Sequence, residues 1–375
     1  MELRSTLALT VLLNTVFFFT GCIKKSKPDN PINDFANIKE ITLKGSEIKL
    51  ENDSVLYDPR TIDVFDSLAV FYDNNGYTAF SLINLKSGKL VKRFAETGSG
   101  DYKFNINSVG LSRVRNSSNE FTVYEASAPY RLFKYNLDKL LTSESYHPYL
   151  VCKLPAETYF INPIMQTDST IIGNIGFSKL DNKVFGIWNL NNNKLTTGVD
   201  LTKSPDARFK EFYYDENIGW TKTVLRPYLA FRPMSEQVAS FSTKGALFQI
   251  FETTNDNPKI LSEKLYYLPE FNILDLGNKS FKSKLTANNR YGYNNIAVTK
   301  DFIYTLFNGK PSESSNLDVV STNIILVYDW NGTPVKKIIL DKDCFQIAID
   351  PQNPKTLFTL TAFKNIGIRK FTLND

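Results

Sequence analysis

Few side chains in this sequence could form a catalytic centre. His147 is the single histidine among 375 residues, and it lies in the turn-like stretch Ser145-Tyr146-His147-Pro148. A nucleophilic triad or a zinc site built on histidine needs further partners that the sequence does not supply around it. The chain also lacks a GxSxG elbow, a P-loop and a GxGxxG fingerprint. We therefore expect His147 to be a surface residue, and we expect no catalytic residue and no cofactor.

Two acidic stretches carry oxygen atoms of the kind that calcium prefers. They are Asp73-Asn74-Asn75-Gly76 and Asp341-Lys342-Asp343. Neither is followed by the twelve-residue loop with a terminal Glu that an EF-hand requires. Asn-Gly and Asp-rich stretches of this length are also ordinary turn chemistry. The sequence therefore predicts turns at both places and no metal site.

The most promising binding surface is aromatic and basic. Tyrosine and tryptophan combined with arginine can stack on sugars or anchor a protein partner. The alternative is that these rings belong to the core, which is the better explanation for any one of them taken singly. The candidate ligand-binding residues are Tyr213, Tyr214, Trp220, Arg226, Arg232 and Tyr291.

The first 22 residues indicate export. After Arg4 comes an apolar run that is too short for a comfortable transmembrane helix and typical of a signal peptide. Gly21-Cys22 at its end resembles the lipobox of bacterial lipoproteins, although Phe19 stands where leucine is usual. The resemblance implies that Cys22 is acylated and anchors the chain to a membrane. We expect a signal peptide over 1–21 and a lipid-anchored flexible tether over 22–36; an uncleaved anchor with an incidental cysteine is the alternative.

Composition excludes several classes of protein. The net charge of +5 is small and spread along the chain, whereas nucleic-acid binders concentrate Lys and Arg on one element. We therefore expect no nucleic-acid partner. Besides Cys22 there are only Cys152 and Cys344, each in an apolar strand-like stretch. We expect two free thiols rather than a disulfide.

One pattern of short strands recurs along the chain. A strand ends in a polar residue, an apolar or aromatic residue follows, and a polar turn leads to the next strand. The spacing averages about 58 residues, against roughly 40–50 for a minimal four-stranded propeller blade. Insertions such as 268–290 and 309–322 explain the excess length. The recurring polar residues are Asn84, Asn136, Asn189, Glu252, Asp329 and Thr372.

Six such units predict an all-β, six-bladed β-propeller over residues 37–375. A ring of sheets avoids exposed edges only if it closes. The last unit, 344–373, has room for three strands, while Ile41–Lys44 and Ser46–Leu50 alternate like strands near the N-terminus. We therefore expect an N-terminal strand to complete the last blade.

At this point the chain resembles the TolB-like six-bladed β-propeller lipoproteins of Gram-negative bacteria. The resemblance rests on Gly21-Cys22, the blade spacing and stretches such as 293–309 and 325–337. It implies a cell-envelope location, which we take as the outer membrane with the periplasmic face favoured, and no single activity. We expect a membrane-tethered binding or scaffold module for a protein or carbohydrate ligand. The alternative is a propeller hydrolase or lactonase with a calcium ion in its channel.

Three serines fit an O-glycosylation signal used by some Gram-negative bacteria, in which Asp-Ser or Asp-Thr precedes an apolar residue or threonine. They are Ser54, Ser67 and Ser169. The alternative is ordinary turn chemistry, since Asp-Ser is also common in turns just before strands.

Overall fold

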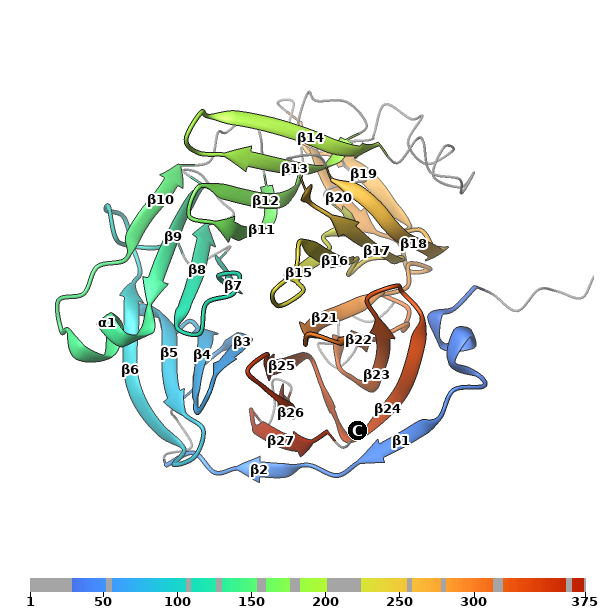
Figure 1. The fold of residues 1–375 in the computed structure, drawn as a ribbon, viewed down its shortest axis with the longest axis horizontal. Helices are drawn as coiled ribbons and strands as arrows, with labels where there is room; N and C mark the ends of the chain where they lie inside the picture. Colours follow the sequence, from blue (N-terminus) through green and yellow to red (C-terminus); the bar gives the residue numbers. More distant parts are fainter. Residues whose placement is uncertain are drawn as a thin grey trace, which may run out of the picture.

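The computed structural model describes residues 29–51, 56–105, 109–125, 130–153, 160–175, 183–200, 224–254, 258–277, 281–312, 320–361 and 366–373. Nearly all regular structure in these ranges is β, arranged as six sheets around a central axis (Figure 1). The α-helix α1 spans Leu137–Thr142. No helix among the described residues is long and apolar enough to cross a membrane.

The first three blades are regular four-stranded antiparallel sheets. Blade one comprises β3 (Pro59–Phe65), β4 (Leu68–Asp73), β5 (Thr78–Asn84) and β6 (Lys89–Glu96). Blade two comprises β7 (Val109–Arg113), β8 (Glu120–Glu125), β9 (Arg131–Asn136) and β10 (Tyr149–Lys153). Blade three comprises β11 (Phe160–Thr167), β12 (Thr170–Ile175), β13 (Lys183–Asn189) and β14 (Lys194–Asp200).

The other three blades follow in chain order. Blade four comprises β15 (Tyr228–Phe231), β16 (Gln237–Phe241), β17 (Ala246–Glu252) and β18 (Lys259–Tyr267). Blade five comprises β21 (Tyr293–Val298), β22 (Phe302–Phe307), β23 (Thr322–Asp329) and β24 (Pro334–Cys344). Blade six contains β25 (Gln346–Asp350), β26 (Asn353–Leu360) and β27 (Ile368–Thr372). The predicted six-bladed propeller is confirmed.

The innermost strands form a closed ring. β3, β7, β11, β15, β21 and β25 each contact the innermost strand of both neighbouring blades, including β25 with β3 (Figure 1). A small hairpin of β19 (Phe271–Asp275) and β20 (Phe281–Leu285) stands outside the blades, within the predicted insertion 268–290. The inner strands therefore enclose a channel that every blade helps to line.

The N-terminal strand closes the ring, as the sequence predicts. β2 (Ser46–Ile48) pairs antiparallel with β27 and is the outermost strand of blade six. β1 (Glu40–Leu43) runs parallel to β24 and adds a fifth strand to blade five. Figure 1 shows both strands along the lower outer edge of the ring. The exposed edges of two blades are thus covered by one segment of chain.

Residues before the expected domain boundary at 37 already pack against the propeller. Residues Pro31–Phe35 form a 3₁₀-helix, η1, capped by the side chain of Asn30. Phe35 is buried and meets the ring of Tyr328 edge-on, with 5.2 Å between centroids. The hydroxyl of Tyr266 donates a hydrogen bond to Asp34 at 2.6 Å. The flexible tether expected over 22–36 is therefore wrong for residues 31–35, because the buried Phe35 ring and the part-buried Tyr266–Asp34 hydrogen bond hold them on blades four and five.

The recurring polar residue has a defined local role. All six of the predicted positions end the third strand of their blade, counted from the channel. In blade one the Asn84 carboxamide oxygen accepts hydrogen bonds from the backbone N–H groups of Lys86 and Ser87. Asn136 caps α1 in the same way, and Asp329 accepts from the N–H groups that follow it. Such side-chain bonds to the following backbone end a strand and start a turn.

The core is divided into six layers, one between each pair of adjacent blades. Each layer is built from side chains of two facing sheets, and phenylalanine and tyrosine are numerous in the layers between blades one and two and between blades four and five. Phe121, for example, stacks on Tyr135 with centroids 5.1 Å apart and also contacts Phe65 of blade one. In these two layers, aromatic rings therefore provide much of the contact between blades.

Candidate functional site

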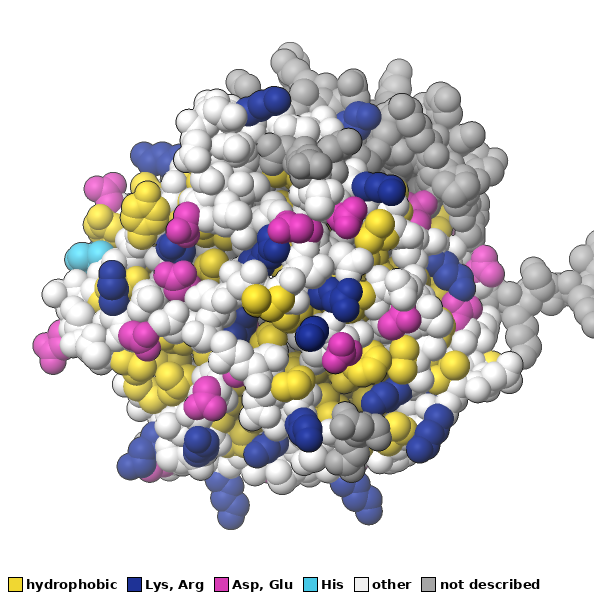
Figure 2. Space-filling model, viewed as in Figure 1, with side chains coloured by type: hydrophobic (Ala, Val, Ile, Leu, Met, Phe, Trp, Pro, Cys, Tyr) yellow, Lys and Arg dark blue, Asp and Glu magenta, His cyan; other side chains and the backbone are white. Residues whose placement is uncertain are grey.

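A cavity of about 380 Å³ lies at one end of the channel. All six blades line it, through their innermost strands and through the turns that follow several of those strands. Its walls are largely aliphatic, with contributions from Ile62, Ile164, Ile296 and Ile349. In the view of Figure 2, hydrophobic and basic side chains surround the centre of the ring. Concave sites with apolar walls and a few polar groups are the usual form of ligand pockets.

Arg113 is the central polar group of this cavity. From β7 in blade two, its guanidinium lies 3.6 Å from a carboxylate oxygen of Asp63 in blade one and 3.5 Å from one of Asp350 in blade six. It also covers the ring of Phe65 at 3.9 Å from the centroid. Burial raises the pKa of Asp63, and the charge of Arg113 opposes that rise. We call Arg113, Asp63 and Asp350 the inner clasp.

A second set of polar contacts joins blades two, three and four at the same end. Arg115 makes a bidentate ion pair with Glu236, at 2.7 and 2.8 Å. Gln166 of blade three donates to the same carboxylate. These donors hold the pKa of Glu236 below its ordinary value, with the hydrogen bond from Arg115 the largest cause.

The remaining links run from blade four through five to six. Arg232 donates from Nε to the backbone oxygen of Lys300 at 2.8 Å, which ties blade four to the first turn of blade five. Asn295 donates to the Gln346 side chain at 2.8 Å and joins blade five to blade six. Gln346 is the first residue of β25, so this last contact lies toward the opposite end of the channel. At the cavity end, polar contacts connect blade six to blades one and two, and continue through blades three and four to blade five.

The structure does not bring the predicted ligand-binding residues together. Tyr213, Tyr214 and Trp220 lie outside the described residues. Arg232 follows β15 and lies at the cavity end, while Arg226 precedes β15 and lies at the opposite end. The expected single surface is therefore wrong for the two arginines, because an entire inner strand separates them.

Tyr291 and Arg226 lie at the end of the channel away from the cavity, near Lys244. The ammonium of Lys244 sits over the Tyr291 ring, 4.0 Å from its centroid. Burial, together with the nearby charge of Arg226, lowers the pKa of Lys244 to about 8. Burial also raises the pKa of Tyr291. This arrangement is a cation–π contact at a blade junction.

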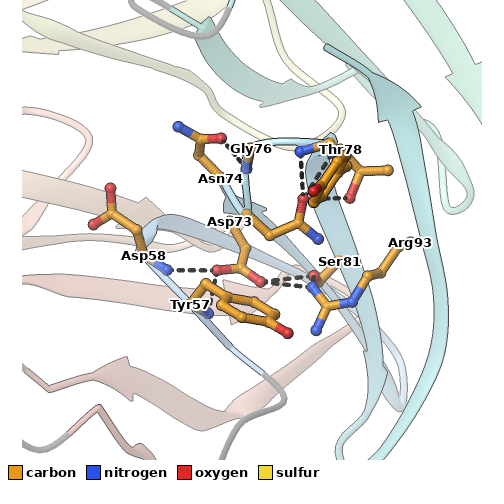
Figure 3. Close-up of polar contacts among 10 residues, drawn as sticks. Tyr57, Asp58, Asp73, Asn74, Gly76, Thr78, Ser81 and Arg93 are labelled. Carbon is orange, nitrogen blue, oxygen red and sulfur yellow. Dashed lines mark hydrogen bonds and ion pairs between the residues drawn. The ribbon is translucent and has the colours of Figure 1, made fainter.

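Asp73, the first residue of the candidate calcium stretch 73–76, is a structural carboxylate. It is fully buried, and both of its oxygens have partners (Figure 3). One oxygen accepts from the backbone N–H groups of Tyr57 and Asp58 at 2.7 and 2.8 Å. The other accepts from Ser81 at 2.8 Å and from Arg93 at 3.2 Å. Asp73 therefore connects the segment that leads into blade one to strands β5 and β6 of that blade.

The second acidic stretch is also occupied by protein donors. Asp341 accepts from the Gly45 backbone N–H at 3.3 Å and from Arg369 at 2.7 Å. Asp343 lies 3.7 Å from the ammonium of Lys310. Among the described residues there is no group of three or more His, Cys, Asp or Glu side chains that could hold a metal ion.

The remaining candidates fall at separate places. His147 is exposed and stacks on Tyr102, as expected of a surface histidine. Cys152 and Cys344 are free thiols, and burial raises the pKa of both. Ser67 and Ser169 occupy matching turns, between the first and second strands of blades one and three.

Two of the earlier predictions concern residues that the structure does not describe. Cys22, the expected lipidation site, lies outside the described ranges, and so does Ser54. Acylation at the first and glycosylation at the second stay predictions.

Sequence reasoning missed Arg113, Asp63, Arg115 and Glu236. Asp63 lies within a strand pattern and Arg113 ends one, so neither differs from an ordinary polar residue at a strand boundary. The one signal was weak: charged residues on strands that face a closed channel need partners, because a buried unpaired charge is costly.

Comparison with protein families gives a match to part of the chain. The model of the TolB-like 6-blade propeller-like family matches residues 181–352. No curated protein matches the chain.

Among solved structures, a member of the DUF4221 family from Bacteroides vulgatus has 9% identity and a TM-score of 0.50, over 89% of this chain and 98% of its own. A structural genomics protein of unknown function from Bacteroides thetaiotaomicron has 12% identity and a TM-score of 0.50, over 88% of this chain and 74% of its own. Raptor from Chaetomium thermophilum has 10% identity and a TM-score of 0.48, over 93% of this chain, which spans only 30% of Raptor.

Similarity at such identities shows the fold alone. The family match begins in blade three and runs through blade five into blade six, and the other blades repeat the same architecture. The chain is therefore a six-bladed β-propeller, and residues 181–352 of it match the TolB-like 6-blade propeller-like family.

Proposed function

We propose that this protein is an exported, membrane-tethered lipoprotein whose propeller binds a protein partner at the cavity end of its channel. The observation that carries the proposal is the cavity of about 380 Å³ that all six blades line. Its aliphatic walls suit an apolar side chain of a partner. Sugar sites rely on stacked aromatic faces, and of the aromatic residues at this cavity, Phe231 already faces the Arg115 guanidinium at 5.5 Å. A protein partner is thus favoured over a glycan.

The inner clasp supports binding rather than metal-assisted hydrolysis. In the rival hydrolase or lactonase, inward carboxylates would hold calcium in the channel. Here the Arg113 guanidinium lies between Asp63 and Asp350, where it supplies the positive charge that a cation would supply. Calorimetric titration with Ca²⁺ separates the two readings. Calcium binding that Asp63→Asn abolishes would favour the rival.

The binding proposal is tested by filling the cavity. Ala230 on β15 is half-buried and lines the cavity. Ala230→Trp should occupy the space of an incoming apolar side chain and remove a partner that wild-type protein retains in a quantitative pull-down from its own envelope. Leu90→Trp, at an exposed position on the outer strand β6, is the matched control. Equal retention by both variants would show that the partner does not use the cavity.

The lipoprotein proposal rests on the sequence around Cys22. Acylation at that residue would place the ring at a membrane surface, with the outer membrane and its periplasmic face favoured. Cys22→Ala should leave unprocessed precursor or unanchored protein. Mass spectrometry of the native N-terminal peptide is the direct measurement. Unmodified Cys22 in protein from its own host would contradict the proposal.

A further inference from the structure

The N-terminal strap, residues 29–51, carries regularly spaced lysines along one edge of the ring. Lys39, Lys44 and Lys49 recur at intervals of five residues, and all three are exposed. Lys342 and Lys370 are exposed on the strands that the strap covers, β24 and β27. These five residues are called the lysine edge. In Figure 2, dark blue side chains predominate over magenta ones along the lower edge of the molecule, where Figure 1 shows β1 and β2.

Most acidic groups near the lysine edge are neutralised by other residues. Glu40 pairs with Lys337 at 2.7 Å, and Glu51 pairs with Lys89 at 3.2 Å. None of the five lysines forms an ion pair with another described residue. The exposed carboxylate of Glu47, on the strap, likewise forms no ion pair with a described residue. Because the counter-charges are used elsewhere, this edge presents excess positive charge to the solvent.

The position of the strap in the chain indicates which anionic surface meets this edge. Asp29, where the described chain begins, lies seven positions after Cys22. Such a segment can span at most about 25 Å. If Cys22 is acylated, as the proposed function holds, the membrane lies within that reach of the strap.

We propose that the lysine edge docks on the anionic lipid headgroups of the membrane that holds the anchor. Clusters of four to eight basic residues beside an anchor bind such headgroups. The edge is part of the outer rim, so docking there sets the channel parallel to the membrane plane, since Figure 1 views the ring along the channel. Both ends of the channel, including the cavity end, then remain open to partners.

The test uses the mature chain with Cys22→Ala, which retains the whole ring and removes the acyl chain. Binding is measured by co-sedimentation with vesicles of phosphatidylcholine alone and of phosphatidylcholine with phosphatidylglycerol. The protein should bind only the anionic vesicles, and added salt should weaken that binding. Each lysine near the surface contributes about fivefold. The triple variant Lys39→Gln, Lys44→Gln and Lys49→Gln should therefore lower the partition coefficient on the order of a hundredfold.

The matched control removes the same charge elsewhere. Lys139→Gln, Lys153→Gln and Lys194→Gln change exposed lysines of blades two and three, away from the strap. This triple should bind as wild type does, and thermal melting checks that both triples remain folded. If the strap triple unfolds, Lys342→Gln with Lys370→Gln replaces it and should lower the partition coefficient by about 25-fold.

Three results would overturn the proposal: equal loss in both triples, equal binding to neutral vesicles, or no binding to either kind. The readout does not depend on acylation, so it is separate from the mass measurement at Cys22. Failure here leaves the anchor intact, and an unmodified Cys22 leaves a positive vesicle result standing.

Discussion

The seam between blades six and one is closed twice, by different means at its two edges. At the outer edge β2 pairs with β27 through the backbone, with Ser46 opposite Lys370 and Ile48 opposite Ile368. At the inner edge the clasp holds the blades through side chains, and Asp350 of blade six also accepts from the Asp66 backbone N–H of blade one at 2.7 Å. One closure uses a continuous strand, and the other uses three charged groups from three blades.

The two closures differ in what they require of the sequence. Backbone pairing needs an alternating strand and an unpaired sheet edge, so many sequences satisfy it. The clasp needs matching charges at three positions, because an unpaired charge in that environment is costly. The outer closure also depends on close backbone contact. The turn glycine Gly88 has a positive φ of +75°, and an added Cβ would lie 1.9 Å from the Lys49 carbonyl oxygen.

The largest expected effect comes from removing the outer closure. Deleting residues 37–51 exposes the edges of β24 and β27 and strips Ile48 and Leu50 from the core layer between blades six and one. The whole domain should lose stability, because an open ring exposes unpaired strands. Thermal melting followed by circular dichroism measures this. An unchanged melting temperature would mean that the strap does not close the ring.

The inner closure should have a smaller but still large effect. Arg113→Met removes the positive charge and leaves two carboxylates facing each other, which costs about 3–5 kcal/mol for a broken buried pair. Denaturant unfolding gives the change in free energy. Arg60→Met is the control, since Arg60 pairs with Asp58 at a largely exposed position and should cost less than about 1 kcal/mol. If both variants lost similar free energy of unfolding, the clasp would stabilise the fold no more than an exposed ion pair does.

The clasp also predicts a dependence of stability on pH. Because burial raises the pKa of Asp63 in the folded chain, the folded state keeps this proton to higher pH than the unfolded state does. Its contribution to stability is complete below the unfolded pKa of about 3.9 and is lost as pH rises through the folded pKa. Asp63→Asn should remove this part of the fall in stability with rising pH. Denaturant midpoints measured across the acidic range would show it, and parallel curves for both proteins would contradict the assignment.

The smallest effect is expected at Ser67, whose turn adjoins the seam. Ser67→Ala should change stability by less than about 0.5 kcal/mol, as should Ser169→Ala in the matching turn of blade three. If the native host glycosylates these turns, each substitution should remove one glycan from the intact mass. Identical unmodified masses for wild type and both variants would remove the modification from consideration.

The sequence by itself determined the blades and their closure. Asn84, Asn136 and Asp329 mark strand ends because their side chains bond to backbone groups only two to four residues away. A contact of that range can be recognised from the sequence alone. Strand alternation at 41–50 likewise belongs to the segment itself, which is why the N-terminal strand could be predicted without its partners. The docking of η1 was missed because Phe35 finds its partner, Tyr328, across the fold.

Only the tertiary structure decided the site. Arg115 and Glu236 are 121 positions apart, and Asp66 and Asp350 are 284 apart. They meet because six sheets close into a ring, which brings one end of every inner strand to the same place. The same closure put Arg226 and Arg232 at opposite ends of the channel, although they are only six positions apart in sequence. Local hydrogen bonding fixes where a strand ends, whereas the curvature of the closed ring fixes which strand ends share a cavity.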